Sequence, residues 1–302
     1  MKPEILSVVA CPECASLPLV IENDRLHCRD CSWQAPLQAS QENQGIGTST
    51  GGIPILTPPP PGMAVSEKIE RNPDSGTPWR QANWRFLKSQ LSLLSPDALI
   101  LDVGAGRGDF AEALSGRRYL ELEVYPYPEV DIVCDLTRVN PFLPESFDAV
   151  LLLNVLEHIY DTRRMLTALA GMLKPNGVLI VAIPFMVKLH QIPVDYVRYT
   201  EYALGQLGEE HGLRVELLEG YYDPIFFLGE GIGNLRWSVL PHLGRSRRYP
   251  ARLALAGMRF LASVLARLVG PGKTMPVNGS ETGQRPRHPI PTGYQIVYRK
   301  PA

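Results

Sequence analysis

Short apolar stretches recur from residue 98 to the C-terminus, and amphipathic stretches separate several of them. The apolar stretches predict strands at 98–103, 119–126, 130–135, 147–154, 178–184, 213–218 and 293–298. In 79–94 apolar positions recur every three or four residues, which predicts a helix, and we expect a second helix over 155–173. Strands that alternate with helices are typical of a doubly wound α/β fold, here with a seven-stranded, mostly parallel sheet.

The first 56 residues follow a different pattern. A short helix is predicted at 3–9 and an apolar strand at 51–56, and four cysteines lie between them. A proline run and a polar segment follow, which favour an extended spacer. We therefore expect a small domain at 1–56, a linker at 57–78 and a larger domain at 79–302, with a helical insertion at about 224–285.

Composition narrows the classes of function. The chain has 302 residues, of which 45% are hydrophobic, enough for a buried core. Thirty Lys and Arg residues against 31 Asp and Glu residues give a net charge of −1, so we expect no bulk attraction to nucleic acid. The sequence shows neither a secretory signal nor a spanning segment, so we expect a cytoplasmic protein whose thiols stay reduced.

The four cysteines form two Cys-x-x-Cys pairs: Cys11 with Cys14, and Cys28 with Cys31. Two tight turns that each present two thiolates, joined by a hairpin, satisfy a tetrahedral zinc ion. A redox pair needs only one such motif. We expect structural zinc, because four thiolates leave no open coordination position for catalysis.

A glycine loop follows the first strand of the larger domain. Gly104, Gly106 and Gly108 allow a tight turn and let a ligand approach the backbone. Asp102 precedes the loop, and Glu123 ends the next strand about 20 residues on, where an acid can accept hydrogen bonds from ribose hydroxyls. The dinucleotide fingerprint G-x-G-x-x-G places its last glycine one residue later than this loop does.

With these motifs, and with the segments 130–135, 147–158 and 173–184, the sequence resembles the class I S-adenosylmethionine-dependent methyltransferases of the type 11 group. The resemblance implies a Rossmann-like fold that binds S-adenosylmethionine. It places Gly104, Ala105 and Gly106 under the methionine part of the cofactor, Asp102 at its amino end, Glu123 at the ribose, Asp135 at the adenine amino group, Leu136 against the adenine ring and Asn154 towards the methyl group.

Two segments are candidates for the acceptor side of the site. Asn154 lacks the following Pro-Pro-Tyr that methyltransferases of amines commonly carry, which points to an oxygen, less readily a carbon, of a small molecule or glycan. His158 is a candidate base, or a residue that only orients or packs. The loop 190–200 resembles the type 11 segment over the acceptor, which makes His190 the alternative base, with Asp195 and Arg198 beside it; a locally paired helix cap is the other interpretation.

The segment 251–270 carries Arg252, Arg259 and Arg267 on one stripe of an otherwise apolar helix. We expect it to be buried against the domain or in a homodimer interface. The alternative is peripheral contact with an anionic membrane through 245–270, which would suit a lipid-linked acceptor.

The helix, cysteine pairs and strand of the first 56 residues resemble the small zinc-ribbon proteins that partner and activate methyltransferases of tRNA and translation factors. This resemblance leaves two alternatives to methylation of a small molecule. One is a methyltransferase of tRNA or protein with a built-in activator ribbon. The other is a non-catalytic binding module whose cofactor pocket is vestigial.

Overall fold

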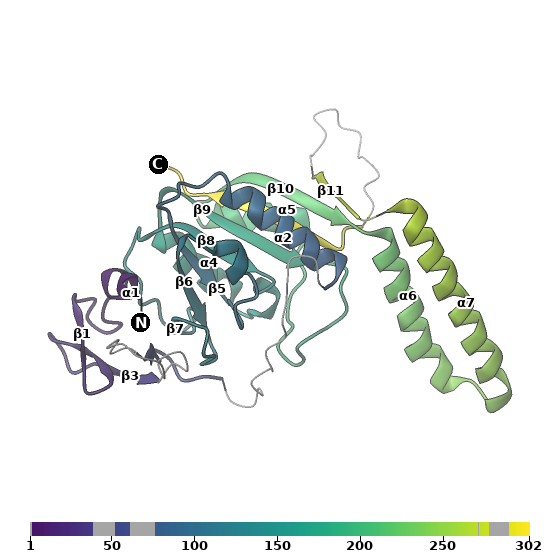
Figure 1. Ribbon diagram of the computed structural model, residues 1–302, viewed down its shortest axis with the longest axis horizontal. Helices are drawn as coiled ribbons and strands as arrows, with labels where there is room; N and C mark the ends of the chain where they lie inside the picture. Colours follow the sequence, from purple (N-terminus) through teal and green to yellow (C-terminus); the bar gives the residue numbers. More distant parts are fainter. Residues whose placement is uncertain (1, 39–51, 61–75, 271, 278–289) are drawn as a thin grey trace.

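The protein is elongated, with a small cysteine-containing sheet at one end, a large sheet in the middle and a helical hairpin at the other end (Figure 1). The structure, a computed structural model, describes residues 2–38, 52–60, 76–270, 272–277 and 290–302. Parts of the predicted linker and of the predicted helical insertion lie outside the described residues.

The large sheet has eight strands in the order β11-β10-β12-β9-β8-β5-β6-β7. The strands are β5 (Leu99–Val103), β6 (Arg118–Glu123), β7 (Ile132–Val133), β8 (Phe147–Leu153), β9 (Leu173–Pro184), β10 (Arg214–Tyr222), β11 (Lys273–Pro276) and β12 (Gly293–Arg299). The five strands from β7 to β9 are parallel, and β12, β10 and β11 pair antiparallel. The predicted fold class is confirmed, and β11 is an eighth strand that the sequence did not predict.

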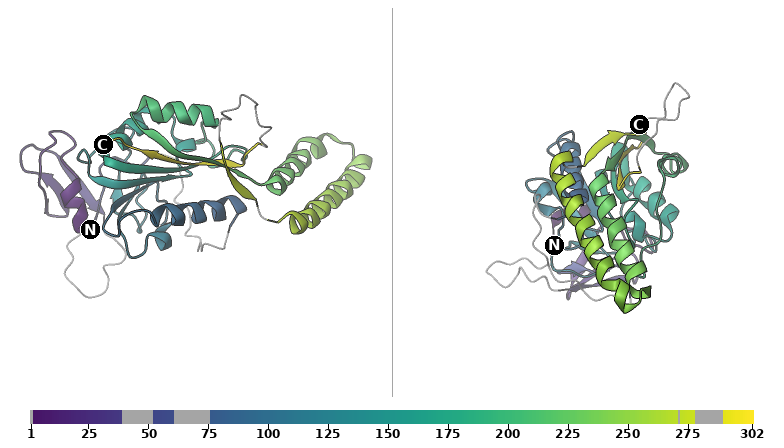
Figure 2. Two further views of the ribbon diagram at one scale, coloured as in Figure 1. Left: turned by 90° about the horizontal axis from the view of Figure 1, so that it is seen from above. Right: turned by 90° about the vertical axis from the view of Figure 1, so that its right-hand side faces the viewer.

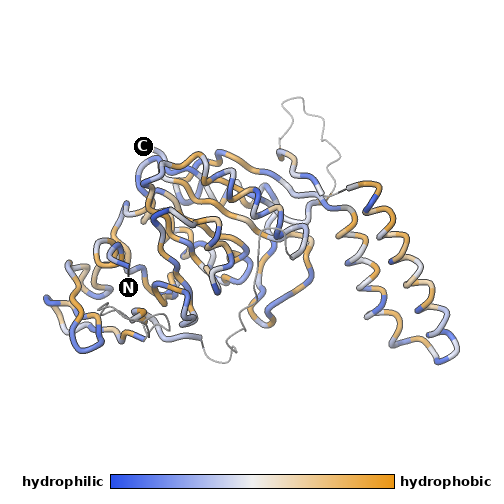
Figure 3. The backbone as a smooth tube through the Cα atoms, in the orientation of Figure 1, coloured by the Kyte–Doolittle hydropathy of each residue, from blue (hydrophilic) through white to orange (hydrophobic). Residues whose placement is uncertain are grey.

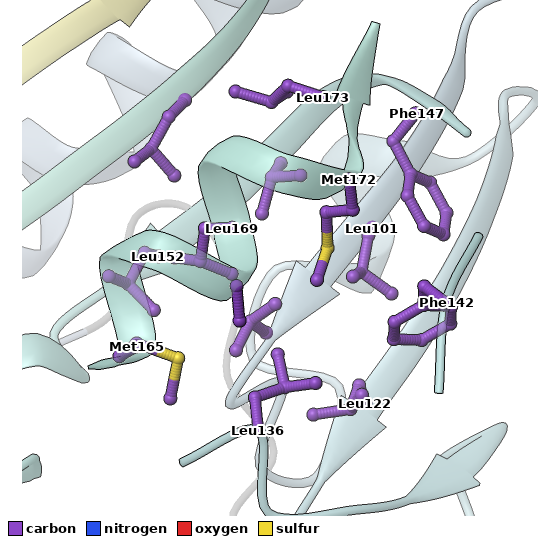
Figure 4. Close-up of a cluster of buried hydrophobic side chains, with 14 of the residues drawn as sticks. Leu101, Leu122, Leu136, Phe142, Phe147, Leu152, Met165, Leu169, Met172 and Leu173 are labelled. Carbon is purple, nitrogen blue, oxygen red and sulfur yellow. The ribbon is translucent and has the colours of Figure 1, made fainter. Parts of the chain in front are cut away.

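Helices cover both faces of this sheet, as Figure 2 shows. They are α2 (Pro78–Leu91) and α3 (Ala111–Leu114) on one face, and α4 (Thr162–Met172) and α5 (Glu201–Glu210) on the other. Alternate residues of β8 serve the two faces: Ala149 and Leu151 pack with α2 and α3, whereas Leu152 packs with α4. Figure 4 shows the α4 side, where Met165, Leu169 and Met172 meet Leu101, Leu122 and Leu152. Burial of both faces explains why the strands are apolar throughout.

The predicted helix over 155–173 is broken in two. A short 3-10 helix, η2 (Leu156–His158), comes first, and α4 begins only at Thr162. Asn154 has a positive φ of 56°, which ends β8 in a sharp turn. Asp161 then starts α4 as its N-cap, because its side chain accepts a hydrogen bond from Arg164 N.

The N-terminal unit is a small antiparallel sheet with one helix. Its elements are α1 (Pro3–Val8), β1 (Leu19–Glu22), β2 (Arg25–Cys28), β3 (Gln34–Gln38) and β4 (Ile53–Pro54). The unit docks on the β7 edge of the large sheet: Ile55 bridges Val133 in parallel, and Leu56 N donates to Val133 O at 2.8 Å. Ile5 and Leu26 belong to the same buried cluster as Leu120 and other sheet residues. Docking therefore covers the edge strand, whose unpaired backbone groups would otherwise be exposed.

The opposite end is a hairpin of α6 (Pro224–Val239) and α7 (Arg245–Val269), joined through the 3-10 helix η3 (Leu240–His242). It projects away from the sheet beyond the β10–β11 pair (Figures 1 and 2). In α7 only Ala262 is buried. The expectation that 251–270 is buried against the domain is therefore wrong, because β10 and β11 hold the base of the hairpin past the end of the sheet. Among the described residues no helix is long and apolar enough to cross a membrane.

Candidate active site and metal centre

The glycine loop lies at the carboxyl end of β5, at the edge where parallel sheets of this kind bind ligands. Gly104 N donates to Leu122 O at 2.8 Å, which joins the loop to β6. Gly104 and Gly106 have positive φ values of 72° and 61°. A Cβ on Gly104 would meet Val155 Cγ2 at 2.4 Å, whereas a Cβ on Gly106 would have nothing within 4 Å. Gly104 is therefore required by packing, and Gly106 borders open space.

Asp102 lies beneath this loop as a buried acid, and the charged groups that shift its pKa within the described residues are all carboxylates. Its side chain is 2% exposed, and Oδ2 has no hydrogen-bond partner. Burial, and then the neighbouring carboxylates of Glu121, Asp109 and Glu123, raise the pKa of Asp102 to about 8. A positively charged group would be stabilised next to this carboxylate, because it would offset both the lost hydration and the repulsion.

Glu123 ends β6, and Asp135 lies two residues after the end of β7, on the same edge of the sheet. Burial raises the pKa of Glu123 to about 7, while its Oε2 accepts a hydrogen bond from Val124 N at 2.9 Å. Asp135 Oδ1 accepts two hydrogen bonds from Thr137, and its backbone N donates to Thr57 Oγ1 at 2.8 Å. Leu136 is buried in the core. The first residue of the predicted linker, Thr57, thus reaches the predicted adenine end of the site directly after the small N-terminal unit.

These features fit the cofactor that the sequence implies. The unpartnered oxygen of Asp102 suits the ammonium group of an amino acid, and the space above Gly106 admits a ligand against the backbone. A sequence family described as a methyltransferase domain matches residues 101–181, the stretch that holds the glycine loop and the acids Asp102, Glu123 and Asp135.

The chain carries a class I S-adenosylmethionine-dependent methyltransferase domain. Among curated proteins it resembles the ubiquinone biosynthesis O-methyltransferases of Xanthomonas campestris pv. campestris, with 29% identity over 136 residues, which is 40% of this chain and 52% of the relative. The chain thus spans about half the length of the curated relatives it matches.

Similar solved structures include a methyltransferase from Archaeoglobus fulgidus (16% identity, 74% of this chain and 95% of that chain covered, TM-score 0.44). Another is the Burkholderia thailandensis 1,6-didemethyltoxoflavin-N1-methyltransferase (17% identity, 74% of this chain and 79% of that chain covered, TM-score 0.44).

In the methyltransferase domain, the N-terminus of α2 completes the ligand-binding edge, which the sequence did not predict. Trp79 Nε1 donates to Asn154 Oδ1 at 2.9 Å, and Asn83 Nδ2 lies 3.4 Å from the same oxygen. Gln295 Nε2 in turn donates to Asn83 Oδ1 at 2.9 Å. The Asn154 side chain is therefore held by α2, and its predicted approach to the methyl group remains a prediction.

The two candidate bases meet in one cluster. His158 in η2 and His190 in the loop after β9 have ring centroids 4.8 Å apart. Between them lies the fully buried carboxylate of Glu157, whose Oε1 is 3.7 Å from His158 Nε2 and 3.6 Å from His190 Nε2. Neither oxygen of Glu157 has a hydrogen-bond partner. The sequence analysis missed Glu157, although its position beside His158 was a signal.

Asp195 and Arg198 hold the loop in place. Arg198 Nη1 and Nη2 donate to the two carboxylate oxygens of Asp195 at 2.5 and 2.9 Å, and Asp195 Oδ2 accepts from His190 N at 2.9 Å. The Arg198 guanidinium holds the pKa of Asp195 at about 2. The neighbouring Glu157 carboxylate raises the pKa of His190, and this effect is larger than the opposing effect of burial. Thr200 caps α5, which agrees with the helix-cap interpretation and gives the loop a structural role. Its position beside the acceptor remains a prediction.

The four predicted cysteine ligands form a second cluster, in the N-terminal unit. Cys11 Sγ lies 3.5 Å from Cys31 Sγ, and Cys14 Sγ lies 3.5 Å from Cys28 Sγ. Thiolates about 2.3 Å from a tetrahedral zinc ion would be about 3.8 Å apart, so the cluster needs only small movements to hold zinc. This cluster and the antiparallel sheet around it are consistent with a zinc ribbon.

Proposed function

We propose that the protein methylates an oxygen of a small or lipid-linked acceptor. This proposal rests on the cluster of Glu157, His158 and His190 at the carboxyl ends of the parallel strands. The imidazole and carboxylate groups of this cluster can accept the proton of a hydroxyl group. The turn after β8 also lacks Pro-Pro-Tyr. The curated relatives carry the name O-methyltransferase, which supports the same class of acceptor.

Each part of the edge has a role in this proposal. When bound, S-adenosylmethionine supplies an electrophilic methyl group. Asp102 holds the amino end of the cofactor, Gly106 leaves space for it and Glu123 holds the ribose. Asp195 and Arg198 position the loop that carries His190. The buried cluster keeps a hydroxyl oxygen near groups that accept its proton, which makes that oxygen a better nucleophile.

Calorimetry with S-adenosylmethionine is the first test, with Glu123→Ala as the variant that loses affinity. Absence of binding would favour the non-catalytic alternative. The second test incubates the full chain and methyl-labelled cofactor with phenols, a lipid-linked glycan fraction, tRNA and protein in parallel. We expect label only in the first two, as an ether on mass fragmentation. Label in tRNA or protein would replace the proposal with the activator-ribbon alternative.

The hairpin supports a lipid-linked acceptor, because its exposed surface combines apolar and cationic side chains. Between residues 224 and 270 there are seven arginines and one glutamate. Figure 3 shows that hydrophobic and hydrophilic residues alternate along both helices. The large exposed hydrophobic side chains are Leu228, Leu235, Trp237, Val239, Tyr249, Leu253, Met258, Phe260, Leu261, Val264, Leu265, Leu268 and Val269. Such a surface matches the interface of an anionic bilayer, with leucines below and arginines at the phosphates.

A groove between α6 and α7, near η3, further supports contact with an anionic membrane surface. Its volume is about 570 Å³, and it is lined by the guanidinium-bearing residues Arg236, Arg248, Arg252 and Arg259 together with Trp237. Arg248 is already fixed, because it donates to Leu243 O and Pro241 O. Several arginines around one groove suit a phosphate group, which accepts paired hydrogen bonds from guanidinium.

Vesicle co-sedimentation tests this contact. We expect binding to vesicles that contain an anionic phospholipid and loss of binding for Trp237→Ser combined with Phe260→Ser, two exposed side chains. Exposed Tyr202→Ser on α5 is the matched control and should bind normally. Light scattering without lipid gives the other outcome: a dimer that the double variant dissociates would assign the hairpin to a homodimer interface.

A further inference from the structure

The cluster of Glu157, His158 and His190 has the form of a metal site. It brings one carboxylate and two imidazoles to a common point, with the ligand atoms all within 4.8 Å of one another. We propose that these three residues bind a divalent transition-metal cation such as Zn²⁺ at the acceptor edge of the methyltransferase domain. This second site differs from the cysteine cluster in position, ligand type and number of protein ligands.

Distances within the cluster are close to those of such a site. Zinc lies about 2.0–2.2 Å from histidine nitrogens and carboxylate oxygens, so two ligands of a tetrahedral centre are about 3.4 Å apart. Glu157 Oε1 lies 3.7 Å from His158 Nε2 and 3.6 Å from His190 Nε2. Contraction by a few tenths of an ångström would bring both of these oxygen–nitrogen distances to that value.

The groups behind the histidines orient the correct nitrogens. His158 Nδ1 donates to Val194 O at 2.5 Å, and His190 Nδ1 lies 3.2 Å from Asp195 Oδ2. A proton on each Nδ1 leaves the lone pair of each Nε2 directed towards Glu157. Metal-binding histidines characteristically donate their other ring N–H to a carbonyl or carboxylate in this way.

Glu157 supplies the strongest sign that a cation belongs here. The side chain is fully buried, and neither carboxylate oxygen accepts a hydrogen bond from any residue that the structure describes. An ionised carboxylate is costly to bury unless it is paired or bound to a metal. Tyr196 N donates to Glu157 O at 2.8 Å, so the backbone is fixed while the carboxylate is left for a ligand. A protonated histidine would also pair with Glu157, and it is the competing occupant.

The ligand set indicates the class of metal. Two imidazoles and one carboxylate suit Zn²⁺, Fe²⁺ or Mn²⁺, whereas Ca²⁺ and Mg²⁺ prefer oxygen ligands. Three protein ligands leave a position open for an oxygen of the acceptor. There the bound cation would replace the proton-accepting role proposed above for the metal-free cluster: it would lower the pKa of a hydroxyl group, which would release its proton to water. This last role rests on the proposed function, but the binding of metal does not.

Metal analysis of the full chain tests the proposal without cofactor or acceptor, so its failure is separate from failure of methyl transfer. After equilibration with Zn²⁺ and gel filtration, we expect two equivalents in the native chain and one in Glu157→Gln or His190→Asn. The matched controls, Glu210→Gln and His242→Asn, change residues outside the cluster and should retain two. Asp195→Asn should lower the affinity for the second zinc equivalent by about 10- to 100-fold.

Co²⁺ identifies which site holds each equivalent. Thiolate ligands of Co²⁺ give an intense charge-transfer band, whereas a site with nitrogen and oxygen ligands gives weaker visible bands. The His190→Asn variant should keep the charge-transfer band and lose the weaker bands. His190 lies on a partly exposed loop, so this variant tests the site even if Glu157→Gln fails to fold. A single equivalent in the native chain, or two equivalents in His190→Asn, would overturn the proposal and leave a protonated histidine as the partner of Glu157.

Discussion

Replacement of Gly106 by alanine isolates the ligand-binding role of the glycine loop from its structural role. Gly106 has a φ of 61°, and a Cβ at this position would have no protein atom within 4 Å. The folded state should therefore lose only the cost of a left-handed alanine, about 1–2 kcal/mol. The added methyl group would occupy the space that S-adenosylmethionine needs, so we expect the affinity to fall by at least about tenfold, or about 1.4 kcal/mol.

Two comparisons separate strain from ligand contact. Gly212 has a φ of 68° and also has nothing within 4 Å of an added Cβ, but it follows α5, away from the glycine loop. Gly212→Ala should lose the same stability and keep full affinity. Gly104→Ala should lose more, because its Cβ would lie 2.4 Å from Val155 Cγ2 and overpacking adds about 1–3 kcal/mol. Val155→Ala in the same chain should recover much of that loss.

Denaturant unfolding measures the stabilities, and calorimetry measures the affinity for S-adenosylmethionine. If Gly106→Ala binds the cofactor as tightly as Gly212→Ala does, the cofactor does not lie against Gly106. The assignment of the loop would then be wrong, even though the fold is that of a methyltransferase.

Three further predictions concern charge and metal. Asp102, with a pKa of about 8, is largely protonated at pH 7, so binding of the cofactor's ammonium group should release close to one proton; calorimetry in buffers of different ionisation enthalpy should show this release and Asp102→Asn should abolish it. Arg198 lowers the pKa of Asp195 to about 2, below its unfolded value near 3.9, so this stabilisation is complete above about pH 4 and is lost as the pH falls towards 2. Arg198→Met should therefore unfold at higher pH in an acid titration followed by circular dichroism, whereas Arg163→Met, which breaks an exposed pair with Glu210, should unfold as the native chain does. Replacement of both Cys11 and Cys14 by serine should remove one zinc equivalent and lower the thermal midpoint; a variant that keeps its zinc would show that these cysteines are not the ligands.

The central sheet could be predicted because its signals are local. Runs such as 147–154 are apolar on both faces, and glycines directly after a strand mark the turn at 104–106. The four cysteines were recognisable from spacing alone. Boundaries were less certain: the helix over 155–173 breaks at Asn154–Asp161, because a left-handed residue and a new N-cap compete with the apolar period.

The candidate site was predicted in pieces but not as an assembly. His158 and His190 were named separately as bases, and only the structure brings both to Glu157. The role of α2 at Asn154 was missed, since Trp79 and Asn83 carried only a helical pattern in the sequence. Contacts between residues 30 or more positions apart depend on where β8 and β9 end, and no local pattern contains that information.

The sequence by itself determined the fold class, the glycine loop and the cysteine pairs, because each follows from the order and spacing of neighbouring residues. Only the tertiary structure decided where the amphipathic surfaces go. The N-terminal unit places its apolar residues on the β7 edge, and the hairpin leaves its apolar residues exposed. The same pattern of leucines and arginines suits a buried helix or an exposed one. The hairpin is exposed because β10 and β11 carry it beyond the sheet.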